Sequence, residues 1–244
     1  MASIIEAVDN TVKEAFAGIK VLVWAVPFCV AYSMNKSNPA LSITIWIIAS
    51  ILFLGFLTES ANNVIKRSGT ILPGVNVLKF GYIGLITSLV MAPYIAVSYF
   101  VMVLFNSFVK IPDPVWQQTA QIICLFLAIT FTLASYVIYI RRLNPFDAYN
   151  MKKYFIGFGE VFLTFSFLIV KLALVSLVII GFLAYVFSLF VGFQNVIWDY
   201  LITSVIVLYL VLAANYLAQI SDEQFVFMEK KEAEAKEKSA INKL

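Results

Sequence analysis

Lys171 is the residue of this sequence best placed to do chemistry, because it stands about eleven residues into the apolar stretch 160–190. A charge inside a bilayer is costly and usually marks a transport path or a pairing. At about 1.5 Å per residue, Lys171 lies roughly 16 Å along the helix, which is mid-bilayer if the helix crosses upright from residue 160. If residues 160–169 lie near the membrane surface and the span is 170–190, the ammonium of Lys171 instead reaches the headgroups of the inner leaflet. Both positions stay open.

Partners for Lys171 are scarce within the chain. Asn215, roughly a turn and a half from the cytoplasmic end of the last predicted span, is a candidate hydrogen-bond partner, as are Ser176 and a lipid phosphate. The other acids near apolar segments fall close to predicted span ends, where water is available: Glu59, Glu160 and Asp199. Since no carboxylate matches the depth of Lys171, a transporter driven by protons or sodium ions is disfavoured.

The residue types needed for most enzyme chemistry are missing. Histidine is absent, which removes the usual haem ligand, most catalytic zinc sites and any histidine-based triad or proton shuttle. Cys29 and Cys124 each stand alone in apolar segments, so we interpret them as small buried hydrophobes without a disulfide. No phosphate-binding glycine loop, CxxC pair, zinc-protease or serine-hydrolase motif is present. We therefore predict no enzyme activity, no catalytic residue, no metal, no cofactor and no nucleic-acid partner.

The elements that carry these residues are predicted to be membrane-spanning helices. Charged residues make up only 13% of the chain, hydrophobic residues 62%, and mean hydropathy is +0.93. About 20 apolar residues cross roughly 30 Å of hydrocarbon. Because lipid offers no hydrogen-bond partners, each span must pair its own backbone N–H and C=O groups, as a helix does. We predict an all-α integral membrane fold with a single transmembrane domain over 1–220 and six transmembrane helices at about 16–34, 41–58, 80–105, 115–140, 160–190 and 198–220.

Basic residues sort the connections into two sides. Fourteen of them lie on the N-terminus, on connections 59–79 and 141–159 and on the C-terminal tail: Lys13, Lys20, Lys66, Arg67, Lys79, Arg141, Arg142, Lys152, Lys153, Lys230, Lys231, Lys236, Lys238 and Lys243. The other connections carry only Lys36 and Lys110. Because positive loops stay inside, both termini are predicted in the cytoplasm and the protein in the cell membrane.

A pattern K-x-x-aromatic-x-G recurs where each outward-running helix begins. It is formed by Lys13, Phe16 and Gly18, by Lys79, Tyr82 and Gly84, and by Lys152, Phe155 and Gly157. Lysine suits the cytoplasmic interface, the ring suits headgroup depth, and glycine allows close helix approach. We interpret the pattern as three helical hairpins, arranged as parallel repeats about an axis along the membrane normal.

Amphipathic helices are predicted at the cytoplasmic surface before two of the spans. Across the N-terminal helix 2–15, apolar residues recur at helical spacing (Ile4, Ile5, Val8, Val12, Phe16 and Ile19), while polar residues take the other face (Glu6, Asp9, Asn10, Lys13 and Glu14). Such a helix is expected to lie on the inner leaflet. A second one is expected over 144–155, with Asn144 as a cap and Pro145 at its first position.

The C-terminal segment 221–244 changes to a charged composition. Glu232 with Lys236 and Glu234 with Lys238 are pairs four residues apart in the order that favours a helix. We predict a charged cytoplasmic helix or tail that extends the last span into water.

Residues 59–73, followed by Gly81 or Gly84 and by Met91-Ala92-Pro93, resemble a prokaryotic membrane family catalogued as domain of unknown function 4013. Asn144-Pro145-Phe146-Asp147-Ala148-Tyr149 and Asn215-Tyr216-Leu217-Ala218-Gln219 are similar to the second half of that family. The resemblance covers most of the chain and implies an archaeal or bacterial cytoplasmic membrane. It brings no assigned activity and no catalytic residues.

The sequence therefore predicts a non-enzymatic membrane protein that acts as a scaffold or accessory subunit of a membrane complex. Its expected partners are the lipid bilayer and other membrane subunits or further copies of itself. The alternative is a permease or lipid-handling protein that uses the repeat axis as its path.

Overall fold

The computed structural model of the chain describes residues 4–14, 16–68, 70–109, 114–151, 154–155, 158–159, 162, 167 and 196–241. Within these residues the regular structure is helical and includes no strand. The helices are α1 (Ile4–Val12), α2 (Ala17–Met34), α3 (Pro39–Ile65), α4 (Val77–Phe108), α5 (Pro114–Arg142), α6 (Pro145–Ala148) and α8 (Val196–Ile241).

Five helices of the described chain are long and apolar enough to cross a membrane: Ala17–Met34, Pro39–Ile65, Val77–Phe108, Val115–Arg142 and Asp199–Glu223. The predicted all-α, multi-pass membrane fold is confirmed at this level. The remaining predicted span, 160–190, falls almost wholly outside the described residues, and Lys171 falls outside them too.

Local capping explains where two of the spans begin. The side-chain oxygen of Asn38 accepts a hydrogen bond from the backbone N–H of Leu41 at 3.1 Å, and Pro39 occupies the first turn of α3. Asn76 caps α4 in the same way through the N–H of Lys79 at 3.0 Å. Asparagine satisfies otherwise unpaired N–H groups, and proline lacks the N–H that would stay unpaired there.

Two glycines allow α3 and α4 to pack backbone against backbone. A Cβ added at Gly55 would overlap the carbonyl of Phe80, and one added at Gly84 would overlap the carbonyl of Ile51. Small residues at such crossings are the usual way for membrane helices to gain close contact. The aromatic rings of Trp24, Phe56 and Phe80 fill the space beside this crossing, with centroids 5.2–5.9 Å apart.

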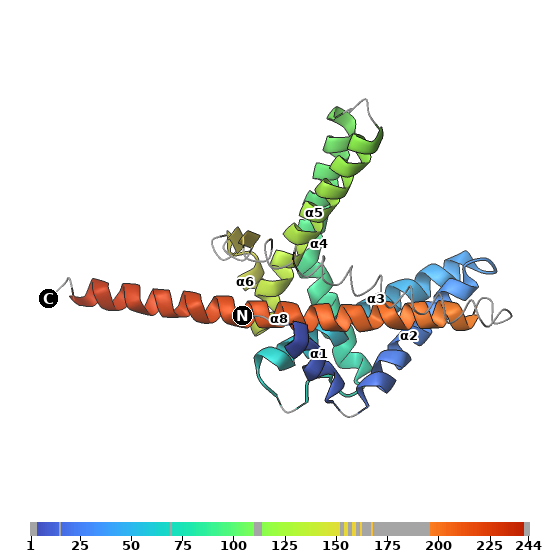
Figure 1. Cartoon of the computed structure of the whole chain (residues 1–244), viewed down its shortest axis with the longest axis horizontal. Helices are drawn as coiled ribbons and strands as arrows, with labels where there is room; N and C mark the ends of the chain where they lie inside the picture. Colours follow the sequence, from blue (N-terminus) through green and yellow to red (C-terminus); the bar gives the residue numbers. More distant parts are fainter. Residues whose placement is uncertain are drawn as a thin grey trace.

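The helices form a bundle from which one hairpin departs. Figure 1 shows α2 and α3 running beside α8, while the hairpin of α4 and α5 leads away from them. The last helix continues past the bundle as a long extension that ends near the C-terminus. Because the connections that carry most basic residues meet at the end of the bundle where this extension leaves, we call it the basic end.

Several helix boundaries differ from the sequence prediction. α3 continues to Ile65, although its span was predicted to end at 58. α8 is one helix to Ile241, so residues 221–241 continue the last span in helical form. The predicted amphipathic helix 144–155 is interrupted, because α6 ends at Ala148 and a turn follows at Tyr149. Asn144 does cap α6, accepting from the N–H of Phe146 at 3.2 Å.

α1 packs on the bundle through small residues that lie outside its predicted apolar face. Ala7 and Thr11 are buried and α1 packs on α8, whereas Ile5 and Val8 of the predicted apolar face are exposed. Small side chains let the two helices approach closely, and Thr11 brings a hydroxyl to a buried amide of α8. The exposed side chains of Ile5 and Val8 are placed as on a helix that lies on a lipid surface.

Candidate functional site

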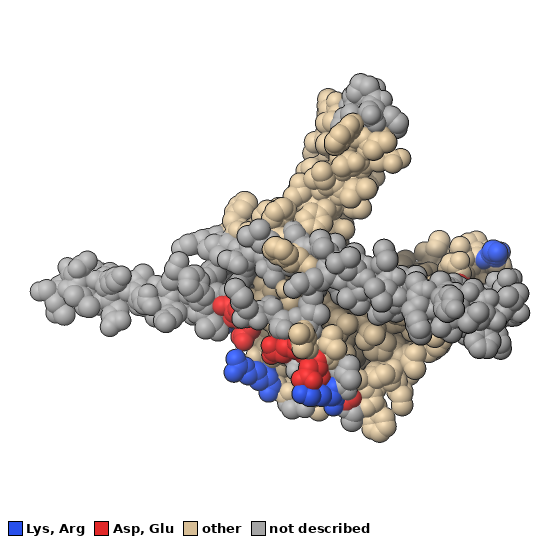
Figure 2. Space-filling view, in the orientation of Figure 1, with Lys and Arg blue, Asp and Glu red and all other residues tan. Residues whose placement is uncertain are grey.

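Charged and polar side chains of the described chain concentrate at the basic end. Figure 2 shows acidic and basic side chains gathered over α1 and the connection after α3, whereas the described residues visible on the projecting part of the α4–α5 hairpin are tan. Five segments meet at this end: α1, the end of α3 with its connection to α4, the end of α5, α6, and α8 around residues 215–223. Any polar chemistry of the described residues is therefore expected here.

Asn215 lies at the centre of a buried hydrogen-bond network that joins three helices. Its side-chain nitrogen donates to the hydroxyl of Thr11 on α1 at 2.7 Å, and its oxygen accepts from the hydroxyl of Ser60 on α3 at 3.2 Å. All three side chains are at most 1% exposed. Thr11 in turn donates to the carbonyl of Ala7 at 2.8 Å. The network fixes α1 against the last span, because an unpaired amide in this setting would be costly.

Glu14 connects the α1–α2 turn to the α3–α4 connection. One carboxylate oxygen accepts from the backbone N–H groups of Ile71 at 2.8 Å and Leu72 at 2.6 Å, and the other accepts from the Lys20 ammonium at 2.6 Å. Lys20 also donates to the carbonyl of Leu72 at 2.6 Å. The Glu14 side chain is 11% exposed, so these charge-assisted bonds are largely shielded from water. We call this arrangement the Glu14 clasp.

Polar groups at the end of α3 are held by neighbouring helices. Glu59 forms an ion pair with Lys79 at 2.5 Å, and the amide of Asn62 donates to the carbonyls of Ile140 at 2.6 Å and Arg141 at 3.1 Å. Asn62 thereby satisfies carbonyls at the end of α5 that have no partner within their helix. These contacts allow α3 to continue past its apolar segment.

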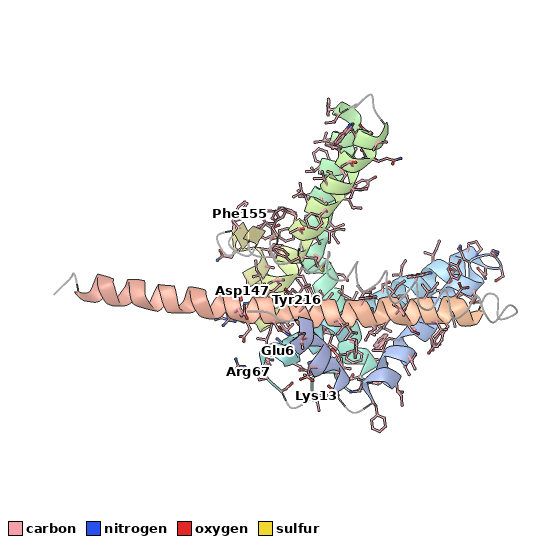
Figure 3. The ribbon with its side chains drawn as sticks, viewed as in Figure 1. Glu6, Lys13, Arg67, Asp147, Phe155 and Tyr216 are labelled. Atoms are coloured by element: carbon pink, nitrogen blue, oxygen red, sulfur yellow. The ribbon has the colours of Figure 1, made fainter. Side chains whose placement is uncertain are left out.

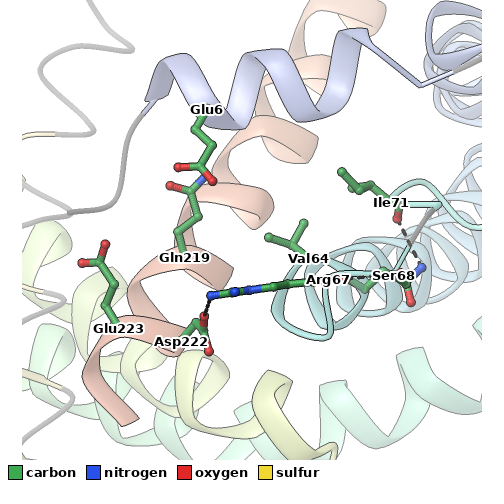
Figure 4. Close-up of a pocket in the computed structure, with 9 residues that line it drawn as sticks. Glu6, Val64, Arg67, Ser68, Ile71, Gln219, Asp222 and Glu223 are labelled. Atoms are coloured by element: carbon green, nitrogen blue, oxygen red, sulfur yellow. Dashed lines mark hydrogen bonds and ion pairs between the residues drawn. The ribbon is translucent and has the colours of Figure 1, made fainter. Parts of the chain in front are cut away.

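A polar cleft of about 560 Å³ opens at the basic end between α1, the end of α3, and α8. Figure 4 shows Arg67 reaching across it, with its guanidinium 3.7 Å from the carboxylate of Asp222. Arg67 has a left-handed backbone (φ 51°) where α3 ends. The remaining polar lining includes Glu6, Gln219 and Glu223. The cleft thus combines three carboxylates with one guanidinium and suits a polar or charged segment better than an apolar ligand.

Tyr154 holds the chain after α6 against the α4–α5 pair. Its ring stacks on Tyr94 with centroids 4.9 Å apart, and its hydroxyl donates to the carbonyl of Phe131 at 2.7 Å. Burial raises the pKa of the Tyr154 phenol, so the hydroxyl stays protonated and remains a donor. Tyr94 donates to the carbonyl of Ala148 at 2.5 Å, which fixes the end of α6.

The residues of the K-x-x-aromatic-x-G pattern occupy unequal environments. Lys13 pairs with Asp9, whereas Lys79 pairs with Glu59 across two helices. A Cβ at Gly18 would meet open space, whereas Gly84 lies at the tight α3–α4 crossing. The three rings share one property, since Phe16, Tyr82 and Phe155 are all exposed. Lys152 and Gly157 are outside the described residues, as is most of the third hairpin, so the repeat stays a prediction.

The structure places Asn215 in the basic-end network, while its predicted partner Lys171 lies outside the described residues. Sequence reasoning assigned Glu14 to the solvent face of α1 and gave Thr11, Ser60 and Lys20 no role in a site. The one available signal was that Ser60 and Asn215 are polar residues inside or beside apolar runs, where each needs a partner.

The arrangement offers hydrogen bonding and charge pairing, not a recognisable reaction centre. The part of the chain that the structure describes contains no group of three acidic or cysteine side chains able to hold a metal ion. Both thiols are unpaired, Cys29 buried and Cys124 partly so. No known protein family, curated protein or solved structure matches this chain, and the resemblance to the family of unknown function 4013 therefore stays a prediction.

Proposed function

We propose that this protein is a non-enzymatic scaffold or accessory subunit of a membrane complex, with six crossings and both termini in the cytoplasm. Under this proposal the sixth crossing is supplied by residues 160–190, and the basic end faces the cytoplasm because of its lysines and arginines. The basic end then serves as the docking side for a partner.

The observation that supports the proposal best is the continuation of α8 beyond the membrane-spanning part. The span ends at Glu223, but the helix runs on to Ile241. The 18 residues from 224 to 241 add about 27 Å of helix at about 1.5 Å per residue. Figure 1 shows this segment, which we call the α8 arm, projecting away from the bundle.

The composition of residues 229–238, within the α8 arm, fits a helix that lies in water. Residues 229–238 alternate between acids, lysines and alanines, and four-residue spacing places opposite charges on neighbouring turns. Residues 229–238 contain no large apolar residue, although Phe225, Val226, Phe227 and Met228 precede them in the arm. The charged segment can bind another protein through charge pairing, and the arm begins directly after Asp222 and Glu223, which line the polar cleft.

The experiment is purification from the native membrane in mild detergent, comparing the full chain with a truncation after Glu223. The full chain should elute with another protein at a fixed ratio, and the truncated chain should lose that protein while remaining monodisperse. A truncation after Ser239 is the matched control, since it shortens the chain but leaves nearly all of the α8 arm. A full chain that elutes alone as a monomer contradicts the proposal.

A lipid-handling function is the second candidate, and grooves on the α4–α5 hairpin favour it. One apolar groove of about 350 Å³ includes Met91, Met102 and Leu133, and another of about 260 Å³ includes Val101 and Phe131. Both grooves border Ser98 and Ala128, whose small side chains leave room for an acyl chain. Native mass spectrometry of Ala128→Phe against the parent tests this function: loss of a retained lipid supports it, and unchanged lipid content opposes it.

A further inference from the structure

The basic end exposes large apolar side chains outside the middle of the membrane-spanning helices. Among the described residues, large apolar side chains more than 70% exposed occur at only six positions, and five of them lie at the basic end: Ile5 at 81%, Phe16 at 73%, Val75 at 77%, Leu78 at 88% and Phe146 at 83%. We call these five residues the apolar collar. They come from four separate parts of the chain: α1, the α1–α2 turn, the beginning of α4 with the residues before it, and α6.

Two collar positions continue the exposed stripes of spanning helices. On α4, Leu78, Tyr82, Leu85 and Leu89 recur at helical spacing and are all more than half exposed. On α2, exposed Ile19, Val23, Val26 and Val30 follow Phe16 in the same manner. Side chains at this spacing share one helix face. At Phe16 and Leu78 the collar is thus continuous with surfaces that lipid covers in a membrane-embedded helix.

The collar also surrounds the basic end instead of forming one patch. Figure 3 places Phe155 and Asp147 on one side of α8, and Lys13 and Arg67 on the other. Figure 1 shows α6, which contains Phe146, on the first side of α8, and α1, which contains Ile5, on the second. A partner protein would cover one side of the bundle, whereas a membrane leaflet contacts all sides of an embedded bundle at the same depth. The distribution of the collar therefore fits a membrane leaflet.

The backbone at Phe16 gives further support. Phe16 has φ 63°, in the left-handed region where glycine is free of strain and a bulky residue is not. Its ring is exposed, so packing on the described bundle does not offset the strain. Contact with lipid would offset it, because a phenyl ring gains free energy on leaving water.

We propose that the apolar collar inserts into the membrane leaflet at the basic end, at the boundary between headgroups and acyl chains. The collar then sets the depth of the bundle, with the polar cleft and the α8 arm on the water side. It also places α1 between two contacts, since Ile5 meets lipid while Thr11, on another face of the helix, holds Asn215. This inference stands independently of the proposed scaffold function.

Depth-dependent fluorescence quenching tests the proposal. Single cysteines at Ile5, Leu78 and Phe146, in a background with Cys29→Ala and Cys124→Ala, are labelled with a polarity-sensitive nitrobenzoxadiazole dye. The purified full chain is reconstituted alone into phosphatidylcholine–phosphatidylglycerol vesicles with brominated acyl chains. Cysteines at Asp9 and Arg67 are the matched controls, because both side chains are exposed and polar, at 48% and 87%.

The expected result is blue-shifted emission at the three collar positions, with quenching by brominated lipid severalfold stronger than at Asp9 and Arg67. Emission and quenching equal to the two controls would show that water covers the collar and would overturn the proposal. Blue-shifted emission without quenching would mean that a second copy of the chain covers it, which also overturns the proposal. Each labelled variant must elute like the parent in detergent, so that misfolded protein is excluded before comparison.

Discussion

The amide of Asn215 donates a 2.7 Å hydrogen bond to the hydroxyl of Thr11, joining two residues 204 positions apart in the sequence. Both side chains are buried, and the oxygen of Asn215 is used at the same time by Ser60. One side chain therefore fixes the N-terminal helix, the second spanning helix and the last spanning helix relative to one another.

Replacing Asn215 by leucine should destabilise the protein by about 1–2 kcal/mol, because it leaves the hydroxyls of Thr11 and Ser60 with fewer partners in a buried site. The measurement is unfolding in detergent followed by circular dichroism. Ser204→Ala is the control, since the hydroxyl of Ser204 donates to the carbonyl of Tyr200 within its own helix, at 2.7 Å. Equal effects of the two substitutions would contradict the role given to Asn215.

Replacing Glu14 by alanine should open the Glu14 clasp, because the N–H groups of Ile71 and Leu72 lose their acceptor and Lys20 loses its counter-ion. Hydrogen exchange of peptides over residues 66–76 should become faster by about tenfold, the change that about 1.4 kcal/mol produces. Asp9→Asn removes an exposed ion pair with Lys13 and should leave that exchange unchanged. Unaltered exchange in Glu14→Ala would exclude the clasp.

The two glycines of the K-x-x-aromatic-x-G pattern that the structure describes, Gly18 and Gly84, should respond in opposite ways to alanine. Gly84→Ala forces a Cβ onto the carbonyl of Ile51, so we expect a loss of about 2 kcal/mol or more, or failure to assemble. Gly18→Ala meets open space and should be neutral or stabilising by up to about 1 kcal/mol. Melting temperatures in detergent provide the comparison. Similar losses at both positions would instead favour equivalent packing in the repeat.

The topology prediction can be checked in intact cells with cysteines introduced into the background without Cys29 and Cys124. An impermeant reagent should label positions near Asn38, Pro112 and Asn195 and should miss Lys66, Arg142 and Lys236. The distribution of fourteen basic residues against two motivates this expectation. Labelling of the second group from outside would reverse or break the proposed orientation.

Replacing Lys171 by methionine keeps the side-chain length and removes the charge. If Lys171 pairs with a carboxylate of a neighbouring subunit, this variant should lose a co-purifying partner while the isolated chain stays folded. Arginine at the same position is the control, because it keeps the charge. Unchanged assembly and stability in Lys171→Met would leave Lys171 as an interfacial anchor.

The C-terminal end of α3 could not be predicted from the hydropathy of the sequence. The apolar run predicted an end at 58, because Glu59 is charged and water was expected there. The helix continues to Ile65 because Lys79 pairs with Glu59, and because the carbonyls of Ile140 and Arg141 accept hydrogen bonds from Asn62. Hydropathy along one segment contains no information about such partners.

For the N-terminal helix, the sequence predicted the position of the helix but not the face that packs on the bundle. Its existence, near 2–15, followed from helical spacing, and α1 covers Ile4–Val12. Its packing face did not follow, because Ala7 and Thr11 are less hydrophobic than Ile5 and Val8. The contact depends on close approach and on a hydrogen bond to Asn215, and both are properties of the facing helix.

The sequence by itself determined that this is a helical multi-pass membrane protein, where the described spans lie, and which connections carry the basic residues. Those features depend on properties of each segment by itself. They are the free energy of transferring an apolar run into hydrocarbon, the capping of helices by Asn38 and Asn76, and the scarcity of charged residues within the spans. Only the tertiary structure decided that Asn215 meets Thr11 and Ser60, that Glu14 holds Leu72, and that five apolar side chains surround the basic end. Such contacts depend on which helices meet and at what register. In a bilayer, lipid solvates every apolar helix surface about equally well, so hydrophobicity does not select the helices that pair. Shape complementarity and hydrogen bonding between the segments select them instead.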